Sequence, residues 1–363
     1  MARAPDVLQS ILTAAQETKH ARIVQIGVGA LHRLVQNGAV DAGSYSGVLD
    51  ALQVLTDAAL EEIKVLQCIL SLVTQGELQG AELARACVLC LRLHFAKDVT
   101  TAAVAAATLR QVVVAVFERV VAEDELRARE GADAAPRAPA AGDAYLLFQD
   151  LCLLTNGESP HWLSGLEEMT RTFGLELIET ALSTHPPLFF QHAEFGFLLK
   201  EHVCSLIIKL FSPGIKHAGK APALLFPVTI RLLRVTLLLI ERYSALVMTE
   251  SEIFLSMLAK LLEPNKLMWQ RVTSLEVRPK RRGWGNRAAA VFPAYVSHFD
   301  AHTNTCLTLS PPPKVVHTIC KQPRLLLIFF QRYDMELNSS NVFRDLVGSR
   351  GLRDDTTGRP CRK

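Results

Sequence analysis

Apolar residues recur along most of this chain at the spacing of an α-helix, and this feature restricts its fold most strongly. They stand three, four and seven positions apart, so that each set lines one face of a helix. The clearest sets are Ile63, Leu66, Leu70 and Val73; Ala84, Cys87, Val88, Leu91 and Phe95; Leu109, Val112, Val113, Val116, Phe117 and Val120; and Phe173, Leu177, Ile178 and Ala181. No comparably long stretch alternates as a β-strand does. The pattern therefore predicts an all-α fold.

Turn-forming residues separate these helical stretches. They include Asn37-Gly38, Gly76, Asn156-Gly157, Pro186-Pro187 and Pro213-Gly214. Successive amphipathic helices joined by short turns are typical of stacked antiparallel pairs, so we expect an armadillo/HEAT-like α-solenoid. No repeat motif recurs at a fixed period, and this prediction depends on the hydrophobic pattern alone.

The most apolar stretch, residues 223–240, is interrupted by Pro227, Arg231 and Arg234. Because charges at the centre of a bilayer are costly, we interpret it as a buried helix rather than a membrane span. The net charge of +3 is too close to balance to indicate a nucleic-acid partner. The eight cysteines show no disulfide-like spacing, as in reduced cytosolic proteins.

Two short motifs suggest chemistry, and each has a simpler structural interpretation. Gly27-Val28-Gly29 resembles the start of a dinucleotide fingerprint, but His32 stands where the third glycine belongs. A patch of small residues on a packed helix is favoured. Cys87-Val88-Leu89-Cys90 is half of a zinc motif without a second pair, although His94 lies one turn further on. Since Cys87 stands on an apolar stripe, a core helix is favoured.

The histidines and acidic residues form no spaced catalytic constellation such as HExxH or GxSxG. His161, His185 and His192 stand at turns and are interpreted as surface residues. The basic run Lys280-Arg281-Arg282 is interpreted as a solvated loop, with a nuclear address or a phosphate patch as the alternatives. We therefore expect no enzymatic activity, no cofactor and no bound metal.

Two segments interrupt the helical pattern. Residues 123–143 have few large apolar side chains and two prolines, so we predict a disordered linker there. Residues 278–315 contain a basic cluster and a run of three prolines, and helical periodicity resumes at about residue 316. The polar tail, residues 348–363, is expected to be unstructured.

Several stretches resemble a known superfamily. Residues 105–125 (AAATLRQVVVAVFERVVAEDE) and 145–155 (YLLFQDLCLLT) resemble the DCB region of the large Arf guanine-nucleotide exchange factors. The superfamily pattern T-x-x-Q-x5-F-x-R falls on Thr108, Gln111, Phe117 and Arg119. Residues 91–98, 169–179 and 197–213 are similar to the MON-two family, the non-catalytic relatives of these exchange factors. This resemblance makes the four pattern residues candidates for protein interaction.

A second region of that superfamily, called HUS, is similar to the later part of the chain. Residues 250–263 fit its start, and QRYDMELNSSNVFRDLV at residues 331–347 resembles the HUS box. Tyr333, Asp334, Asn341 and Phe343 occupy the box positions and are the second set of candidate interaction residues.

The resemblance implies a domain organisation. It gives a DCB-like helical region at residues 1–122, from which the family's first helices are expected to be missing. It gives the remainder of DCB and the start of HUS at residues 144–277, and a HUS-box segment at 316–347. Joining Val277 to Val316 restores a helical pattern. We therefore interpret residues 278–315 as a non-family insert, and the chain as a partial or mispredicted gene product.

The resemblance also implies a function. Family members are scaffolds at trans-Golgi and endosome membranes, so a cytoplasmic, peripheral membrane location is expected. The implied partners are a second copy of the chain, a Dopey-type protein and an Arl- or Arf-family small GTPase. The alternative is the regulatory arm of an active large Arf exchange factor. An unrelated armadillo cargo adaptor and an independent enzyme are less favoured, because the HUS box and the missing constellation speak against them.

Overall fold

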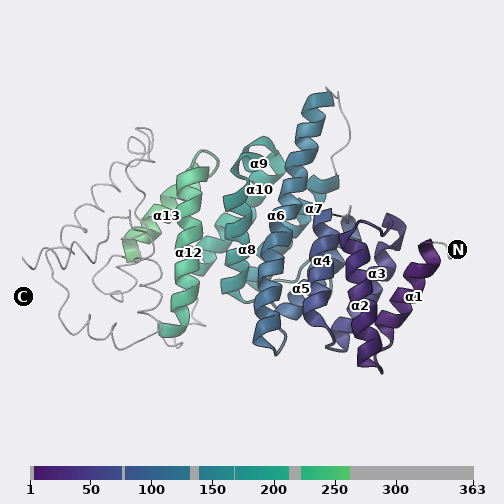
Figure 1. Ribbon diagram of the computed structural model, residues 1–363. Coiled ribbons are helices and arrows are strands. Elements are labelled where there is room, and N and C mark those ends of the chain that lie inside the picture. Colours follow the sequence, from purple (N-terminus) through teal and green to yellow (C-terminus); the bar gives the residue numbers. More distant parts are fainter. Residues whose placement is uncertain (1–3, 76–77, 131–138, 167, 212–221, 262–363) are drawn as a thin grey trace, which may run out of the picture. The chain divides into compact units, whose positions relative to one another are not determined.

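The structure, a computed structural model, describes residues 4–75, 78–130, 139–166, 168–211 and 222–261. All of them belong to one compact unit, Met1–His298. Within these ranges every regular element is a helix, which confirms the all-α prediction (Figure 1). In chain order the elements are α1 (Ala4–Gln16), α2 (Ala21–Gln36), η1 (Ala42–Ser44), α3 (Tyr45–Asp57), α4 (Glu62–Gln75), α5 (Gly80–His94), α6 (Val99–Glu130), α7 (Pro139–Asn156), α8 (Arg171–Thr184), α9 (Pro186–Gln191), α10 (Ala193–Leu198), η2 (Leu199–Cys204), α11 (Ser205–Phe211), α12 (Pro222–Tyr243) and α13 (Met248–Leu261).

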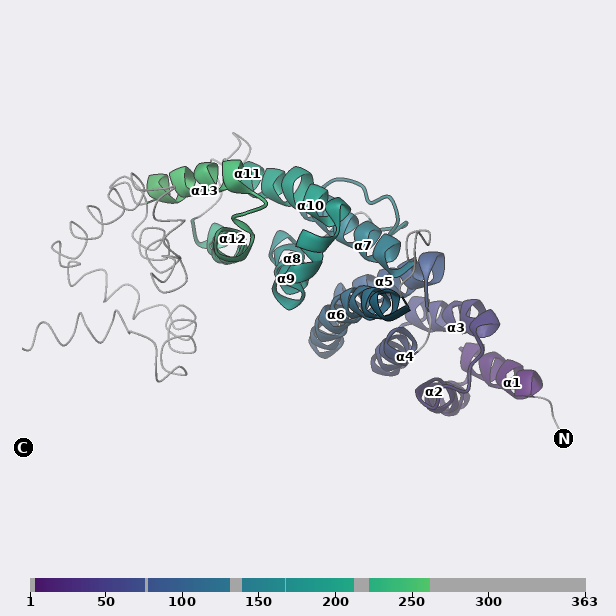
Figure 2. The same cartoon turned by 90° about the horizontal axis from the view of Figure 1, so that it is seen from above.

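The described helices pack in two rows that follow the order of the chain (Figure 2). In the α6 row, α2, α4, α6, α8 and α12 each contact the next. In the α7 row, α1, α3, α5 and α7 do the same, followed by α10, the π-helical η2, α11 and α13. Pairs such as α1 with α2, α5 with α6 and α7 with α8 join the rows. These stacked helix pairs fit the predicted α-solenoid.

The longest helix, α6, shows how sequence and packing agree. Its apolar set is almost wholly removed from water: Leu109, Val112, Val113, Val116, Phe117 and Val120 are each at most 3% exposed. The helix contacts α4, α5, α7 and α8, so apolar side chains are needed on several faces. Residues 99–129 are also long and apolar enough to cross a bilayer by length and composition. A core helix of a packed solenoid meets the same criteria, and α6 has this packing.

Residues 223–240, interpreted from the sequence as a buried helix, lie in α12. Leu232, Val235 and Leu239 are at most 3% exposed and belong to the continuous core. The interpretation of this stretch as a buried helix is confirmed for these residues. Arg231, one of the charges that interrupts the apolar run, forms ion pairs that are described below.

The prediction of a disordered linker over residues 123–143 is wrong at both ends. α6 continues to Glu130, and α7 begins at Pro139. Ala, Glu and Arg are strong helix formers, and Pro at the first helical position loses no hydrogen bond. The small side chains of Ala140 and Ala141 are 5% exposed and pack well without large apolar neighbours. Residues 131–138 lie outside the described part of the chain.

Two of the predicted apolar sets include one residue each that is not buried. In α4 the buried face comprises Val65, Leu66, Cys68, Ile69, Leu72 and Val73. Ile63, counted as a core residue from its spacing, is 40% exposed. Phe95, the last member of the second set, is 48% exposed beyond the end of α5. The spacing predicts the direction of the stripe, but helix ends can leave the core.

Gly27 lies inside α2, so the resemblance to a dinucleotide fingerprint has no strand-to-helix turn to support it. A Cβ at Gly27 would stand 2.7 Å from the backbone nitrogen of Ala15. A Cβ at Gly29 would meet nothing within 4 Å. The favoured interpretation, small residues on a packed helix, is confirmed for Gly27, which lets α1 and α2 approach closely.

Candidate interaction surfaces and the centre of α6

The structure places three of the four pattern residues of α6 inside the fold. Thr108 is 5% exposed, and Phe117 is fully buried. Arg119 is half-buried, whereas Gln111 is exposed. Three of the four pattern residues therefore contribute to the packing of α6. Gln111 is the pattern residue that is exposed to solvent.

Phe117 is the centre of an aromatic cluster. Its ring lies 6.0 Å from Phe148 in α7 and 6.0 Å from Phe189 in α9, and Phe195 in α10 is 5.8 Å away. Tyr243 in α12 meets Phe189 at 5.4 Å and donates a hydrogen bond of 2.6 Å to the carbonyl of Leu182. Aromatic pairs at such distances add to the free energy of burial. The cluster joins helices that are distant in the sequence.

Arg119 and its neighbour Asp143 fix the joint between α4 and α5. The guanidinium of Arg119 donates to the carbonyl of Leu78 at 2.5 Å and to that of Val73. These carbonyls lie at the end of α4 and just beyond it, where the last turn of a helix lacks its own donors. Asp143 accepts a 2.9 Å hydrogen bond from the N–H of Gly80, the first residue of α5. Two side chains from α6 and α7 thus secure both sides of the α4–α5 turn.

Burial disfavours the ionised forms of Arg119 and Asp143. Removal from water lowers the pKa of Arg119, and the nearby Asp143 carboxylate opposes this change. Burial likewise raises the pKa of Asp143, while the N–H of Gly80 and Arg119 lower it. Arg119 and Asp143 are partly buried, and each charge therefore stabilises the ionised form of the other.

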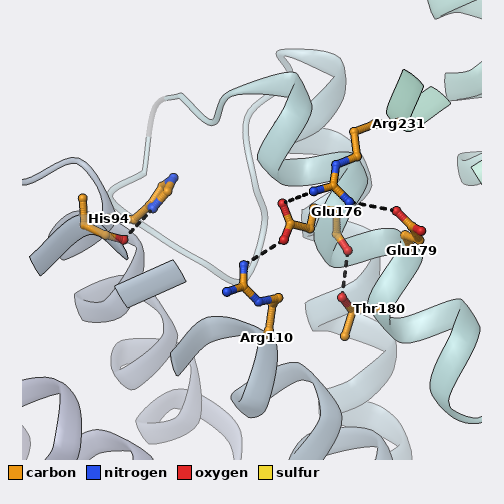
Figure 3. Close-up of polar contacts among 7 residues, drawn as sticks. His94, Arg110, Glu176, Glu179, Thr180 and Arg231 are labelled. Atoms are coloured by element: carbon orange, nitrogen blue, oxygen red, sulfur yellow. Dashed lines mark hydrogen bonds and ion pairs between the residues drawn. The ribbon is translucent and has the colours of Figure 1, made fainter. Parts of the chain in front are cut away.

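A chain of ion pairs joins three helices of the α6 row (Figure 3). Arg110 in α6 contacts Glu176 in α8 at 2.7 Å, and Arg231 in α12 contacts the other oxygen of Glu176 at 2.9 Å. Arg231 also reaches Glu179 at 3.2 Å. Because the four side chains are 23–38% exposed, the network is shielded in part from water and salt.

Sequence reasoning missed this network. Arg231 was noticed only as a charge that argues against a membrane span. Its partner Glu176 lies 55 residues earlier in the chain, and no local spacing reveals such a pair. The nearby His94, also drawn in Figure 3, is within 3.3 Å of the Ala102 carbonyl and stacks on Phe173 at 4.0 Å.

The two cysteines of the CxxC motif are core residues. Cys87 is 1% exposed and Cys90 is fully buried. Burial raises the pKa of Cys87 to about 12 and that of Cys90 well above its ordinary value. Both are free thiols that pack inside the core. Within the described ranges, no group of three or more His, Cys, Asp or Glu side chains is placed to hold a metal ion.

His192 is not the plain surface residue that its turn position suggested. Its Nε2 lies 2.7 Å from Asp124 near the end of α6, and its side chain is 15% exposed. His192 also precedes α10, so this contact ties the α9–α10 turn to α6. The interpretation of His192 as a surface residue is wrong, because the partner lies 68 residues away and cannot be inferred from local sequence.

Several exposed apolar side chains lie near the beginnings of three helices of the α6 row. α2, α4 and α6 are successive members of that row, and α2 and α6 run in the same direction (Figure 1). Ile23 and Ile26 lie in the first two turns of α2, and Ile63 and Val99 lie in the first turns of α4 and α6. Phe95 lies in the connection between α5 and α6. These five residues, here called the apolar edge, are 40–81% exposed. Large apolar side chains that stay in water on neighbouring helices are candidates for a contact with another protein.

The second set of candidate residues, Tyr333, Asp334, Asn341 and Phe343, lies outside the described residues. The predicted insert at 278–315, the HUS-box segment at 316–347 and the tail at 348–363 also lie outside them. These assignments stay predictions.

Two family models match the chain. The first is described as the Mon2/Sec7/BIG1-like dimerisation and cyclophilin-binding domain, DCB, and matches residues 1–124. The second is the Mon2/Sec7/BIG1-like HUS domain and matches residues 140–280. The interval between the two matches coincides with the end of α6 and the start of α7.

Curated relatives agree with these matches. A protein MON2 homolog from Xenopus laevis is 40% identical over 383 residues, which covers 96% of this chain and 20% of the relative. The human MON2 homolog is 41% identical over 357 residues, with 92% of this chain and 18% of the relative covered. That of Drosophila melanogaster is 36% identical over 359 residues, with 92% and 19% covered. The chain thus spans about a fifth of the length of these relatives.

Proposed function

Because the chain belongs to the Mon2/Sec7/BIG1-like family, with a DCB domain followed by a HUS domain, we propose that it is a non-enzymatic scaffold of Golgi–endosome vesicle trafficking. The apolar edge of the DCB domain is the single observation that carries this proposal. It presents side chains suited to another protein, and a solenoid offers long surfaces of this kind. A cytoplasmic location at the membranes of these organelles belongs to the same proposal.

Self-association through the apolar edge is the most direct form of this function. The family description of residues 1–124 names dimerisation, which supports a second copy of the chain as a partner. A Dopey-type protein and an Arl- or Arf-family GTPase are further proposed partners, supported by the sequence resemblance. Binding of each to the immobilised chain would test them separately.

Self-association is tested with the double variant Ile26→Asp/Ile63→Asp. Charged groups cannot be buried in an apolar contact without a large cost, so the dimer dissociation constant should rise by at least about tenfold. Analytical ultracentrifugation of the full chain measures this constant. Phe197→Asp is the matched control, because Phe197 is also exposed, at 54%, but lies in α10 away from the edge. Equal dissociation constants for the double variant and the control would contradict the proposal.

The absence of enzymatic activity is a separate prediction. The release rate of a fluorescent guanine nucleotide from Arf and Arl proteins should stay at its intrinsic value when this chain is added. A rate that rises with the concentration of the chain would refute the scaffold proposal.

The alternative, a regulatory arm of an active exchange factor, is supported by the inclusion of Sec7 and BIG1 in the description of both domains. The MON2 names of the relatives support the scaffold instead. A transcript that continues into an exchange domain would decide for the alternative.

A further inference from the structure

The outward face of α2 carries an apolar side chain between two positive charges. The helix turns its other side to the core through Val24, Gly27, Val28, Leu31 and Val35. Arg22, Ile26 and Arg33 lie opposite, because they stand four and seven positions apart and so share one helix face. All three are exposed, Ile26 at 66%. The sequence of α2 contains no Asp or Glu, so the charge on this face is of one sign.

The two arginines are not used by the fold as ion pairs. Arg22 and Arg33 pair with no acidic side chain among the described residues, whereas Arg85 in α5 pairs with Asp50 in α3. The two arginines are eleven positions apart, a span of about 16 Å along the helix. Exposed charges of one sign at this spacing attract a surface that carries the opposite charge.

Gly29 lies between Ile26 and Arg33 on this side of the helix. Glycine inside a helix is destabilising relative to alanine, so its presence needs a packing reason. At Gly27 that reason is the backbone of α1, but a Cβ at Gly29 would meet nothing within 4 Å. The missing side chain leaves an open space on the exposed face. Glycine commonly stands where another backbone approaches closely, and a partner at this face would supply the packing reason.

We propose that this face of α2 binds an acidic amphipathic helix of a partner protein. Two carboxylates three turns apart on that helix would pair with Arg22 and Arg33. An apolar side chain between them would pack on Ile26 and fill the space at Gly29. A helix fits this face because its residues return to the same side at the same spacing. Amphipathic helices that bind through anchors of this kind are a common mode of recognition.

Charge separates this partner from a second copy of the chain. Two copies packed α2 on α2 would set arginine against arginine, whether the helices ran parallel or antiparallel. Like charges opposed in this way disfavour a contact. Self-association through the apolar edge would therefore place α2 against another helix. An anionic membrane would attract the arginines as well, but that attraction does not depend on the space at Gly29.

An acidic partner helix goes beyond the proposed self-association, because it is a second kind of partner. Ile26 belongs to the apolar edge as well, so the two partners would compete for it. Their tests have separate readouts. A chain that dimerises but does not bind an acidic helix refutes only the helix. A chain that binds the helix but stays monomeric refutes only self-association.

The test uses the full chain and a fluorescent, stapled helical peptide that carries a glutamate at each end of a leucine face, three turns apart. Fluorescence anisotropy measures the dissociation constant of this peptide. A peptide with lysine in place of both glutamates should bind at least about tenfold more weakly, because like charges then meet. Arg22→Glu/Arg33→Glu should reverse the preference, so that the lysine peptide binds more tightly.

Lys97→Glu/Lys200→Glu is the matched control, because it changes the net charge equally at two exposed lysines outside α2. It should keep the wild-type preference for the glutamate peptide. Gly29→Gln separates binding from folding, since glutamine is a good helix former and has room there. This variant should be at least as stable in urea as the wild type, yet bind the glutamate peptide at least about threefold more weakly.

Several outcomes would overturn the proposal. One is equal affinity of the wild type for the two peptides, which would indicate apolar binding alone. Another is an Arg22→Glu/Arg33→Glu variant that is folded by circular dichroism and keeps the wild-type preference, or a Gly29→Gln variant that binds normally. The last is no binding of the glutamate peptide up to about 1 mM. If vesicles of phosphatidylcholine and phosphatidylserine then bound the wild type but not the arginine variant, the face would be a membrane contact instead.

Discussion

At the scale of single residues, Gly27 shows how a missing side chain sets the distance between two helices. Glycine inside a helix costs up to about 1 kcal/mol relative to alanine, so its presence needs a packing reason. The reason is the backbone of α1, because a Cβ at Gly27 would lie 2.7 Å from Ala15 N and 2.9 Å from Ala14 C. Gly29, two positions later, has no neighbour within 4 Å of its Cβ position.

Gly27→Ala should therefore lower the stability of the protein, whereas Gly29→Ala should not. Gly27→Ala forces α1 away from α2, and overpacking of this kind costs roughly 1–3 kcal/mol. Gly29→Ala adds helix propensity without a clash and should be neutral or stabilising by up to about 1 kcal/mol. Chemical denaturation of both variants measures the free energy of unfolding. A Gly27→Ala variant at least as stable as the wild type would contradict the close packing of α1 on α2.

Glu123 also acts at the residue scale, through its charge. Burial raises its pKa, Asp124 and Asp143 raise it further, and Arg127 and the Ala140 N–H lower it. Because its folded-state pKa is raised, the group contributes most stability below its ordinary pKa and loses this contribution as pH rises through the folded pKa.

Glu123→Gln should consequently gain in unfolding temperature over the wild type as the pH rises, because burial disfavours the ionised carboxylate and leaves the neutral amide unaffected. The difference should shrink as the pH falls below the ordinary pKa of a glutamate, where the carboxyl group becomes protonated and loses its charge. Thermal unfolding followed by circular dichroism over this pH range checks the sign. Glu118→Gln, which changes an exposed carboxylate, should show no comparable difference at any pH.

At the scale of elements, Arg119 shows how one helix holds the end of another. The end of α4 leaves backbone carbonyls without intrahelical donors. Val73 and Leu78 are buried, so water cannot replace the guanidinium that donates to their carbonyls. The carbonyls of Val73 and Leu78, at the end of α4 and just beyond it, are therefore held by a donor from α6.

Arg119→Met should lower the free energy of unfolding by roughly 2–4 kcal/mol, because two buried carbonyls lose a charged donor. Arg129→Met serves as the control on the same helix. Arg129 is 75% exposed and forms a 3.5 Å pair with Glu125, which should contribute about 0.5 kcal/mol or less. Urea denaturation of both variants measures the difference, and equal losses would exclude the capping role of Arg119.

At the scale of the whole described unit, the core does not stop where one family domain ends and the next begins. One continuous core runs from Leu8 in α1 to Leu258 in α13. Phe117, in the DCB match, packs on Phe148, Phe189 and Phe195, which lie in the HUS match. The ion pair of Arg110 with Glu176 and the contact of Asp124 with His192 also cross this boundary.

Residues 1–130 alone should therefore be much less stable than residues 1–261. The shorter fragment exposes the face of α6 that packs on α7 and α8, including Phe117. Loss of the partners of one buried aromatic already costs several kcal/mol, which corresponds to a drop of roughly 10 °C or more in melting temperature. Differential scanning calorimetry of both fragments measures it. Equal melting temperatures would mean that the two domains are energetically independent.

Hydrophobic periodicity alone was sufficient to predict much of the fold of this protein. The all-α class, the buried set of α6 and the core role of Cys87 follow from short-range spacing, because helix geometry places residues three and four apart on one face. The family resemblance followed from continuous stretches such as residues 105–125. Sequence also marked Phe117 and Arg119 as special, although not for their packing and capping roles.

Only the tertiary structure decided which long-range partners meet. Glu176 lies between Arg110 and Arg231, which are 66 and 55 residues away in the sequence. Asp143 accepts a hydrogen bond from Gly80, which is 63 residues away. The exposure of Ile63 likewise depends on how the helices stack. So does the buried Oε2 of Glu123, which has no hydrogen-bond partner among the residues that the structure describes. Local sequence determines which face of a helix is apolar, because that depends on neighbours within two turns. The stacking of the helix rows decides which charged side chains form pairs and which apolar side chains stay exposed. A local sequence pattern does not contain this information.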